Sequence, residues 1–202
     1  MTYRILRVFL TIIILGGCST VQTPLQPVEW QSHQQRLQQI STYQIVGKLG
    51  YISPQERRSL NFQWKKSDHH SQLRLTTFLG QTVLKMDIYP QRAEADTYEG
   101  QHYTAQTPEL LLHQLTGLDI PLSSLSQWIL GRPALADNFS LNPENTLDSL
   151  EKRLANQQWR VQYKTYTAVT FKTHPLPLPD RLSLQQGSTK INIHISQWKV
   201  TQ

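Results

Sequence analysis

The stretch Ser59-Leu60-Asn61-Phe62-Gln63-Trp64-Lys65 alternates polar and apolar side chains along its whole length. Successive side chains of a β-strand point to opposite faces of the sheet, so this stretch predicts a strand with Leu60, Phe62 and Trp64 on one face. The other face carries only polar and charged groups. Strands of this kind are typical of an antiparallel sheet that is packed on one side and solvated on the other.

The same alternation recurs on both sides of this stretch. The clearest further examples are Leu84–Ile88, Trp159–Tyr163 and Ile191–Ile195. Shorter candidate strands are Tyr43–Tyr51, Gln72–Thr76, Glu94–Tyr98, His102–Ala105, Ala168–Lys172 and Arg181–Leu184. Turn-forming residues separate them at Ser53-Pro54, Ser67-Asp68, Leu79-Gly80, Glu99-Gly100 and Gln186-Gly187. Many consecutive strands joined by short turns indicate an antiparallel meander rather than a parallel βαβ sheet.

Short amphipathic helices are predicted at the N-terminus and in the centre of the chain. Thr107, Pro108 and Glu109 form a typical helix start, with an N-cap, a proline in the first turn and an acidic residue. The predicted helices cover Trp30–Ile40, Leu110–Leu115, Leu122–Leu130 and Glu144–Asn156, the last with Leu147, Leu150 and Leu154 on one stripe.

A curved sheet with one apolar face needs a cover, and three short helices from one central insertion can supply it. A small closed barrel fills its interior with side chains. An incomplete barrel under a helical lid can instead hold an apolar cavity, which is the kind of site that takes acyl chains. In the alternative interpretation, Phe62, Trp64, Met86 and the isoleucines form an ordinary core.

The N-terminus predicts a lipid anchor. An apolar run from Ile5 to Leu15 follows Arg4 and ends in Leu15-Gly16-Gly17-Cys18, which is similar to a bacterial lipobox. Cys18 is the only cysteine of the chain. The run is shorter than the roughly 20 residues that a membrane-spanning helix needs. Ser19 after the cysteine, rather than Asp, resembles the signal that releases lipoproteins to the outer membrane of Gram-negative bacteria.

We therefore expect three segments: a cleaved signal peptide over residues 1–17, a lipidated N-terminus and flexible tether over 18–29, and one domain over 30–202. The formal charge is +6, and removal of Arg4 and Arg7 with the signal leaves +4. In this compartment such a charge favours anionic lipid headgroups or an acidic protein over nucleic acid. A simple contribution to solubility is the alternative.

No catalytic or metal-binding pattern is present in the sequence. The seven histidines lack the spacing of a metal site, and Asp68-His69-His70 falls in a predicted hairpin turn. No GxSxG, HExxH or SxxK motif occurs. We expect a protein that is not an enzyme and that carries neither cofactor nor metal.

Several motifs, in this order and spacing, resemble the LolB family of outer-membrane lipoprotein receptors over essentially the whole mature chain. The most specific are Leu115-Thr116-Gly117, Ile120-Pro121-Leu122 and Trp128-Ile129-Leu130-Gly131. The others are Trp30–Gln34, Gly47–Tyr51, Phe62-Gln63-Trp64, Phe78-Leu79-Gly80, Trp159–Tyr163 and Leu176-Pro177.

The resemblance implies an α+β fold, an unclosed antiparallel β-barrel of about 11 strands covered by short α-helices with an apolar cavity between. It implies a monomer, anchored in the outer membrane, that accepts acylated lipoproteins from the periplasmic carrier LolA and inserts them into the outer membrane without ATP. The alternation of the strands then suggests the residues of the acyl-binding cavity: Phe62, Trp64, Leu73, Leu75, Leu84, Met86, Ile88, Trp128, Ile129, Ile193 and Ile195.

The loop Phe78-Leu79-Gly80 offers two large apolar side chains where turns usually present polar ones. By the resemblance, Leu79 matches a leucine that enters the membrane, although Phe78 stands where the family more often has proline. Folding back of Phe78 and Leu79 into the core is the alternative. Two rival functions remain open: a protein-binding scaffold of the envelope and a lipid-modifying enzyme.

Overall fold

The computed structural model describes residues 25–97, 100–154 and 156–201. The predicted signal peptide, Cys18 and most of the predicted tether lie outside these residues, as do Tyr98 and Glu99 of one predicted strand and turn.

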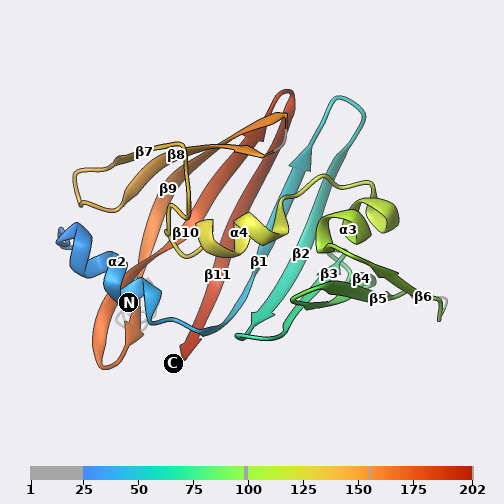
Figure 1. The fold of residues 1–202 in the computed structure, drawn as a ribbon, viewed down its shortest axis with the longest axis horizontal. Coiled ribbons are helices and arrows are strands. Elements are labelled where there is room, and N and C mark those ends of the chain that lie inside the picture. Colours follow the sequence, from blue (N-terminus) through green and yellow to red (C-terminus); the bar gives the residue numbers. More distant parts are fainter. Residues whose placement is uncertain (1–24, 98–99, 155, 202) are drawn as a thin grey trace, which may run out of the picture.

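Eleven strands form one antiparallel sheet, in the order β6-β5-β4-β3-β2-β1-β11-β10-β9-β8-β7 (Figure 1). Strands β6 and β7 are its two edges and do not pair with each other, so the barrel is unclosed, as predicted. The bounds are β1 Thr42–Ile52, β2 Arg57–Lys66, β3 Ser71–Thr76, β4 Thr82–Tyr89, β5 Arg92–Asp96, β6 His102–Ala105, β7 Asn138–Leu141, β8 Leu147–Leu154, β9 Gln157–Phe171, β10 His174–Gln186 and β11 Thr189–Thr201.

Three short helices lie on one side of this sheet (Figure 1). Helix α2 (Trp30–Gln38) precedes the sheet, whereas α3 (Pro108–Thr116) and α4 (Leu122–Trp128) belong to the segment between β6 and β7. This segment therefore starts at one free edge of the sheet and ends at the other. Among the described residues, no helix is long and apolar enough to span a membrane.

The helix starts follow the sequence signals. The Thr107 side chain accepts a hydrogen bond from the Leu110 backbone N–H, and Pro108 occupies the first turn of α3. Gly117 ends α3 with φ +71°, a left-handed conformation that glycine adopts without strain.

The face of the sheet toward the helices, here called the inner face, is apolar, as the alternation predicts. In β2, Leu60, Phe62 and Trp64 are buried while their neighbours are more exposed. The same pattern continues through β1, β3, β4 and β11. One continuous core fills the space between this face and the three helices.

The predicted helix over Glu144–Asn156 is wrong: these residues contain the β7–β8 turn and strand β8. Leu147, Leu150 and Leu154 have helical spacing, but residues 149–154 of β8 pair with residues 157–162 of β9, and residues 147–151 pair with β7. The turn Asn142-Pro143-Glu144-Asn145 was the signal for a hairpin, since Asn142 bonds Thr146 and Asn145 has φ +58°. Only two lid helices thus come from the central insertion, and the third, α2, is N-terminal.

Candidate lipid-binding site

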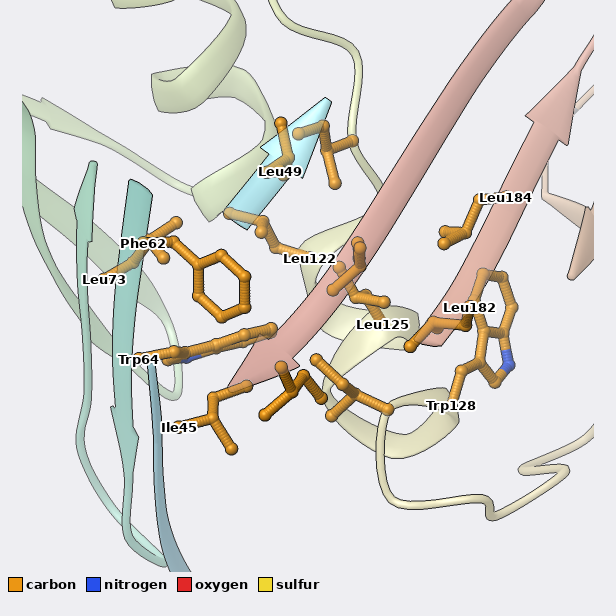
Figure 2. Close-up of a cluster of buried hydrophobic side chains, with 14 of the residues drawn as sticks. Ile45, Leu49, Phe62, Trp64, Leu73, Leu122, Leu125, Trp128, Leu182 and Leu184 are labelled. Atoms are coloured by element: carbon orange, nitrogen blue, oxygen red, sulfur yellow. The ribbon is translucent and has the colours of Figure 1, made fainter. Parts of the chain in front are cut away.

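A wholly apolar cavity lies between the inner face and the lid helices α3 and α4. Its walls come from strands β1, β2, β3 and β11 on one side and from the lid segment on the other. The lining residues are Leu49, Phe62, Trp64, Leu73, Leu75, Leu112, Ile120, Leu122, Leu125, Ile129 and Ile193. Figure 2 shows Leu122 and Leu125 of α4 facing Phe62 and Trp64 of β2 across this space.

The cavity is almost filled in this structure. The space that a water-sized sphere can enter is about 20 Å³. On this measure one water molecule needs roughly 10–15 Å³, so the space has room for about one water and is far too small for an acyl chain. The walls carry no polar surface that would retain water or a polar ligand. The structure therefore shows the lid closed, and an apolar guest can enter only if the lid helices move away from the sheet.

Two buried tyrosines fasten the C-terminal end of α4 to the sheet. The hydroxyl of Tyr43 on β1 donates to the Ser126 carbonyl at 3.2 Å, and that of Tyr163 on β9 donates to the Trp128 carbonyl at 2.9 Å. Carbonyls of the last helical turn lack partners within the helix. The Trp128 carbonyl also accepts from the Gly131 backbone N–H at 2.9 Å, so Tyr163 is its second donor. Burial raises the pKa of both tyrosines, which keeps them neutral donors.

Arg132, just after α4, adds a second fastening, to the C-terminal end of α2. Its guanidinium donates to the carbonyls of Leu37 and Ile40 and to the Gln127 side chain. Burial lowers the pKa of Arg132. The N-terminal end of α4 has no side-chain cap, and there Ser123 N–H donates to Glu109 of α3 at 2.7 Å. Arg58 of β2 in turn donates to the Thr116 carbonyl at the C-terminal end of α3 at 2.7 Å. Hydrogen bonds from the sheet thus hold the C-terminal ends of both lid helices, and apolar contact holds the rest of the lid.

The structure brings together part of the predicted cavity set. Phe62, Trp64, Leu73, Leu75, Ile129 and Ile193 line the cavity. The others do not line it, although all but the partly exposed Ile88 are buried in the same core: Leu84, Met86, Ile88, Trp128 and Ile195. Trp128 lies beside Leu182 and Leu184, across α4 from Phe62 (Figure 2).

The alternation missed Leu49 and the lid side of the cavity, where Leu112, Ile120, Leu122 and Leu125 lie. The spacing of Leu122 and Leu125 marks an apolar helix face, and this signal could have placed them opposite the sheet. Among residues 25–97, 100–154 and 156–201, no group of three or more potential ligands is placed to hold a metal ion.

The loop between β3 and β4 projects two apolar side chains into solvent. Phe78 is 84% exposed and Leu79 is 80% exposed, so they do not fold back into the core. The loop is closed by hydrogen bonds from Thr77 N–H to the Gln81 carbonyl and from Gly80 N–H to the Thr77 carbonyl. Gly80 has φ +86°, which suits glycine. A tight turn thus holds Phe78 and Leu79 outward.

Comparison with known proteins identifies relatives over nearly the full length. The family model "Outer membrane lipoprotein LolB" matches residues 41–198. Outer-membrane lipoprotein LolB of Vibrio cholerae is 48% identical over 197 residues, covering 96% of this chain and 95% of the relative. LolB of Pectobacterium carotovorum is 38% identical over 207 residues, covering 98% of each chain.

Solved structures share the fold at low identity. A putative outer membrane lipoprotein-sorting protein domain from Vibrio parahaemolyticus has a TM-score of 0.56 at 6% identity, covering 85% of this chain and 90% of that one. A LolA superfamily protein from Nitrosomonas europaea has a TM-score of 0.52 at 8% identity, covering 87% and 95%. Together with the sequence matches, the unclosed barrel and its helical lid show that this chain belongs to the LolB family of outer-membrane lipoproteins.

Proposed function

We propose that this protein accepts acylated lipoproteins from the periplasmic carrier LolA and delivers them to the outer membrane by moving their acyl chains between two apolar cavities. The observation that carries this proposal is the purely apolar cavity under a lid whose two helices are held to the sheet by a few hydrogen bonds at their C-terminal ends. Such a site fits a flexible hydrocarbon guest and offers nothing to a polar one.

The energetics favour direct contact between carrier and acceptor. Moving hydrocarbon into water costs about 0.8 kcal/mol for each CH₂ group, so several acyl chains would cost tens of kcal/mol in free solution. A guest that passes from one cavity straight into another avoids this cost, and no ATP is needed for the step. The two free edges of the sheet, β6 and β7, are only four residues long, which disfavours edge-to-edge pairing. We take the working unit to be a single chain.

Delivery needs a second element, and we assign it to Phe78 and Leu79. Burying a large apolar side chain gains about 1.5–3 kcal/mol, so insertion of these two into the bilayer is favourable. Insertion brings the cavity close to the acyl region of the membrane. The loop belongs to the β3–β4 hairpin, whose inner face contributes Leu73 and Leu75 to the cavity wall.

A two-stage transfer assay tests this proposal with Leu79→Glu. The first stage measures uptake of an acylated lipoprotein from LolA, and the second measures its insertion into liposomes. We expect normal uptake but at least tenfold slower insertion, because a carboxylate does not enter hydrocarbon.

Leu135→Glu is the matched control, since Leu135 is 89% exposed and the change adds the same charge elsewhere. Its insertion rate should equal that of the wild type. Equal insertion by Leu79→Glu and the wild type would overturn the role of the loop. Failure of the wild-type chain to take up acylated cargo would overturn the transfer itself and leave the envelope scaffold as the better interpretation.

A further inference from the structure

The outer face of the sheet is strongly basic over its five central strands. Here the basic outer face means the outward residues of β3, β2, β1 and β11 and of residues 181–185 in β10. These segments contain no aspartate or glutamate. They present the exposed cations Lys48, Arg57, Lys65, Arg74, Arg181, Lys190 and Lys199.

The strand register places these cations side by side. Lys48 lies opposite His194, and His194 lies opposite Arg181, so these three form one row across β1, β11 and β10. In another row Arg74 lies opposite Lys85 of β4 and opposite Gln63 of β2. Among the described residues, none of the seven cations takes part in an ion pair. Their charge is thus directed outward.

The carboxylates of the sheet lie beside this face, and Asp180 directly precedes Arg181 in β10 and lines a hollow together with it. Asp87 on β4 bonds His70 and Gln72, and Glu151 on β8 pairs with Arg160. The three helices all lie on the opposite side of the sheet (Figure 1), so the basic outer face is not covered by them. A pocket of about 370 Å³ hollows it at one end, and its lining includes Lys65, Lys66 and Lys199.

We propose that the basic outer face docks the protein onto an anionic bilayer surface by binding lipid phosphates. An anionic membrane attracts each nearby lysine or arginine without needing shape complementarity. Protein interfaces instead depend on buried aromatic or large apolar anchors. The only large apolar residues on this face are the half-buried Val46 and Ile52, so it fits a headgroup layer better than an acidic protein.

The position of the apolar loop agrees with this assignment. Phe78 and Leu79 follow directly from β3, whose outward cation Arg74 is four residues before Phe78. Headgroup binding by the face and insertion of the loop can therefore act at the same membrane surface. The lipid anchor of an outer-membrane lipoprotein keeps the domain near a bilayer. Electrostatic attraction, which salt screens beyond about 10 Å, is effective at that distance. The proposal concerns membrane contact alone and does not depend on acyl transfer.

Vesicle binding by the mature chain from residue 18 onward, with Cys18→Ala, tests the proposal and retains the whole folded part. We expect tight binding to phosphatidylethanolamine–phosphatidylglycerol vesicles, weak binding to phosphatidylcholine vesicles, and loss of the difference at high salt. Lys48→Gln with Arg74→Gln should weaken binding to anionic vesicles about 25-fold, at about fivefold for each cation.

Arg153→Gln with Lys172→Gln is the control, because it removes two exposed cations that lie off this face. It should change binding less than threefold, and Lys48→Arg with Arg74→Lys should retain binding. The proposal is overturned if both double glutamine variants weaken binding to anionic vesicles equally. It is also overturned if Lys48→Gln with Arg74→Gln does not weaken that binding. Unchanged vesicle binding with lost affinity for LolA would assign the face to a protein partner instead. Uptake of acylated cargo by the same variants shows separately whether the proposed function holds.

Discussion

Gly47 shows how one missing side chain shapes the inner face. It lies where the pairing of β1 with β11 shifts register, between Val46 and Gly47. A Cβ atom there would collide with the His194 carbonyl and would lie 2.9 Å from the ring of Phe62. The space that glycine leaves is occupied by the ring of a cavity-lining residue.

We expect Gly47→Ala to lower the free energy of unfolding by about 1–3 kcal/mol, because backbone and ring must both shift. Gly50→Ala is the control in the same strand, since its Cβ would have no neighbour closer than 4.0 Å. Urea unfolding followed by circular dichroism measures both. Equal stability of the two variants would contradict this account of Gly47.

For single residues, the sequence predicts which side chains are exposed better than it predicts which side chains line the cavity. The outward position of Phe78 and Leu79 follows from a turn that is too tight to fold back. Strand alternation correctly placed Met86 and Ile195 on the inner face, but both lie away from the free space. Alternation reports which face a residue occupies. It cannot report where along that face the lid leaves a gap, because that depends on helix placement.

Among the elements, the lid is fastened by hydroxyl groups whose loss we expect to speed its opening. Tyr43→Phe with Tyr163→Phe keeps both rings but removes the donors to Ser126 and Trp128. A hydrogen bond contributes about 1 kcal/mol, so each hydroxyl should change the lid equilibrium about fivefold. Stopped-flow binding of a fluorescent fatty acid should show faster association.

Tyr166→Phe is the matched control. Its hydroxyl donates to the Leu147 carbonyl of β8, outside the lid, at 2.8 Å. Its association rate should equal that of the wild type. If the double variant also associates at the wild-type rate, these two tyrosines do not limit opening.

Docking of α2 should depend on pH through His33. This histidine is 3% exposed, and its Nε2 lies 3.0 Å from the Pro177 carbonyl, to which it donates. Burial is the main cause that lowers the pKa of His33, and nearby Arg36 lowers it further. The unfolded chain therefore takes up a proton near pH 6.5 while the folded chain still resists it.

Stability should be greatest above about pH 6.5 and should decline as pH falls below it, by at most about 1.4 kcal/mol per pH unit for one proton. Urea midpoints at several pH values measure this for the wild type and His33→Gln. The stability of His33→Gln should decline less steeply than that of the wild type as the pH falls. The same pH dependence in both proteins would remove His33 as its source.

The misassigned strand β8 marks the limit of prediction at the element scale. Residues 147–154 carry an apolar stripe that fits a helix, and no local feature of those residues excludes one. The strand is selected by its neighbours, because residues 149–154 pair with β9 on one side and residues 147–151 pair with β7 on the other. Pairing with other strands thus overrides the helical spacing of the apolar residues in β8. Helix α3 has its own capping residues, and the sequence predicts its bounds almost to the residue.

For the whole molecule, location and cargo handling should be separable. The cavity and the described hydrogen bonds that hold the lid lie within residues 37–193, away from Cys18. We expect the mature chain with Cys18→Ala to take up acylated cargo from LolA at close to the wild-type rate. Transfer measured with purified proteins in detergent-free buffer checks this. A large loss of uptake would show that the anchor also takes part in acceptance.

The free edges of the sheet are joined by the lid segment, residues 106–137, and this has a mechanical consequence. Both ends of the lid segment are tied to the edge strands, so displacement of the lid by a guest acts on both edges of the sheet. We expect this load to change the distance between β6 and β7, and probes on these strands should register cargo that touches neither of them.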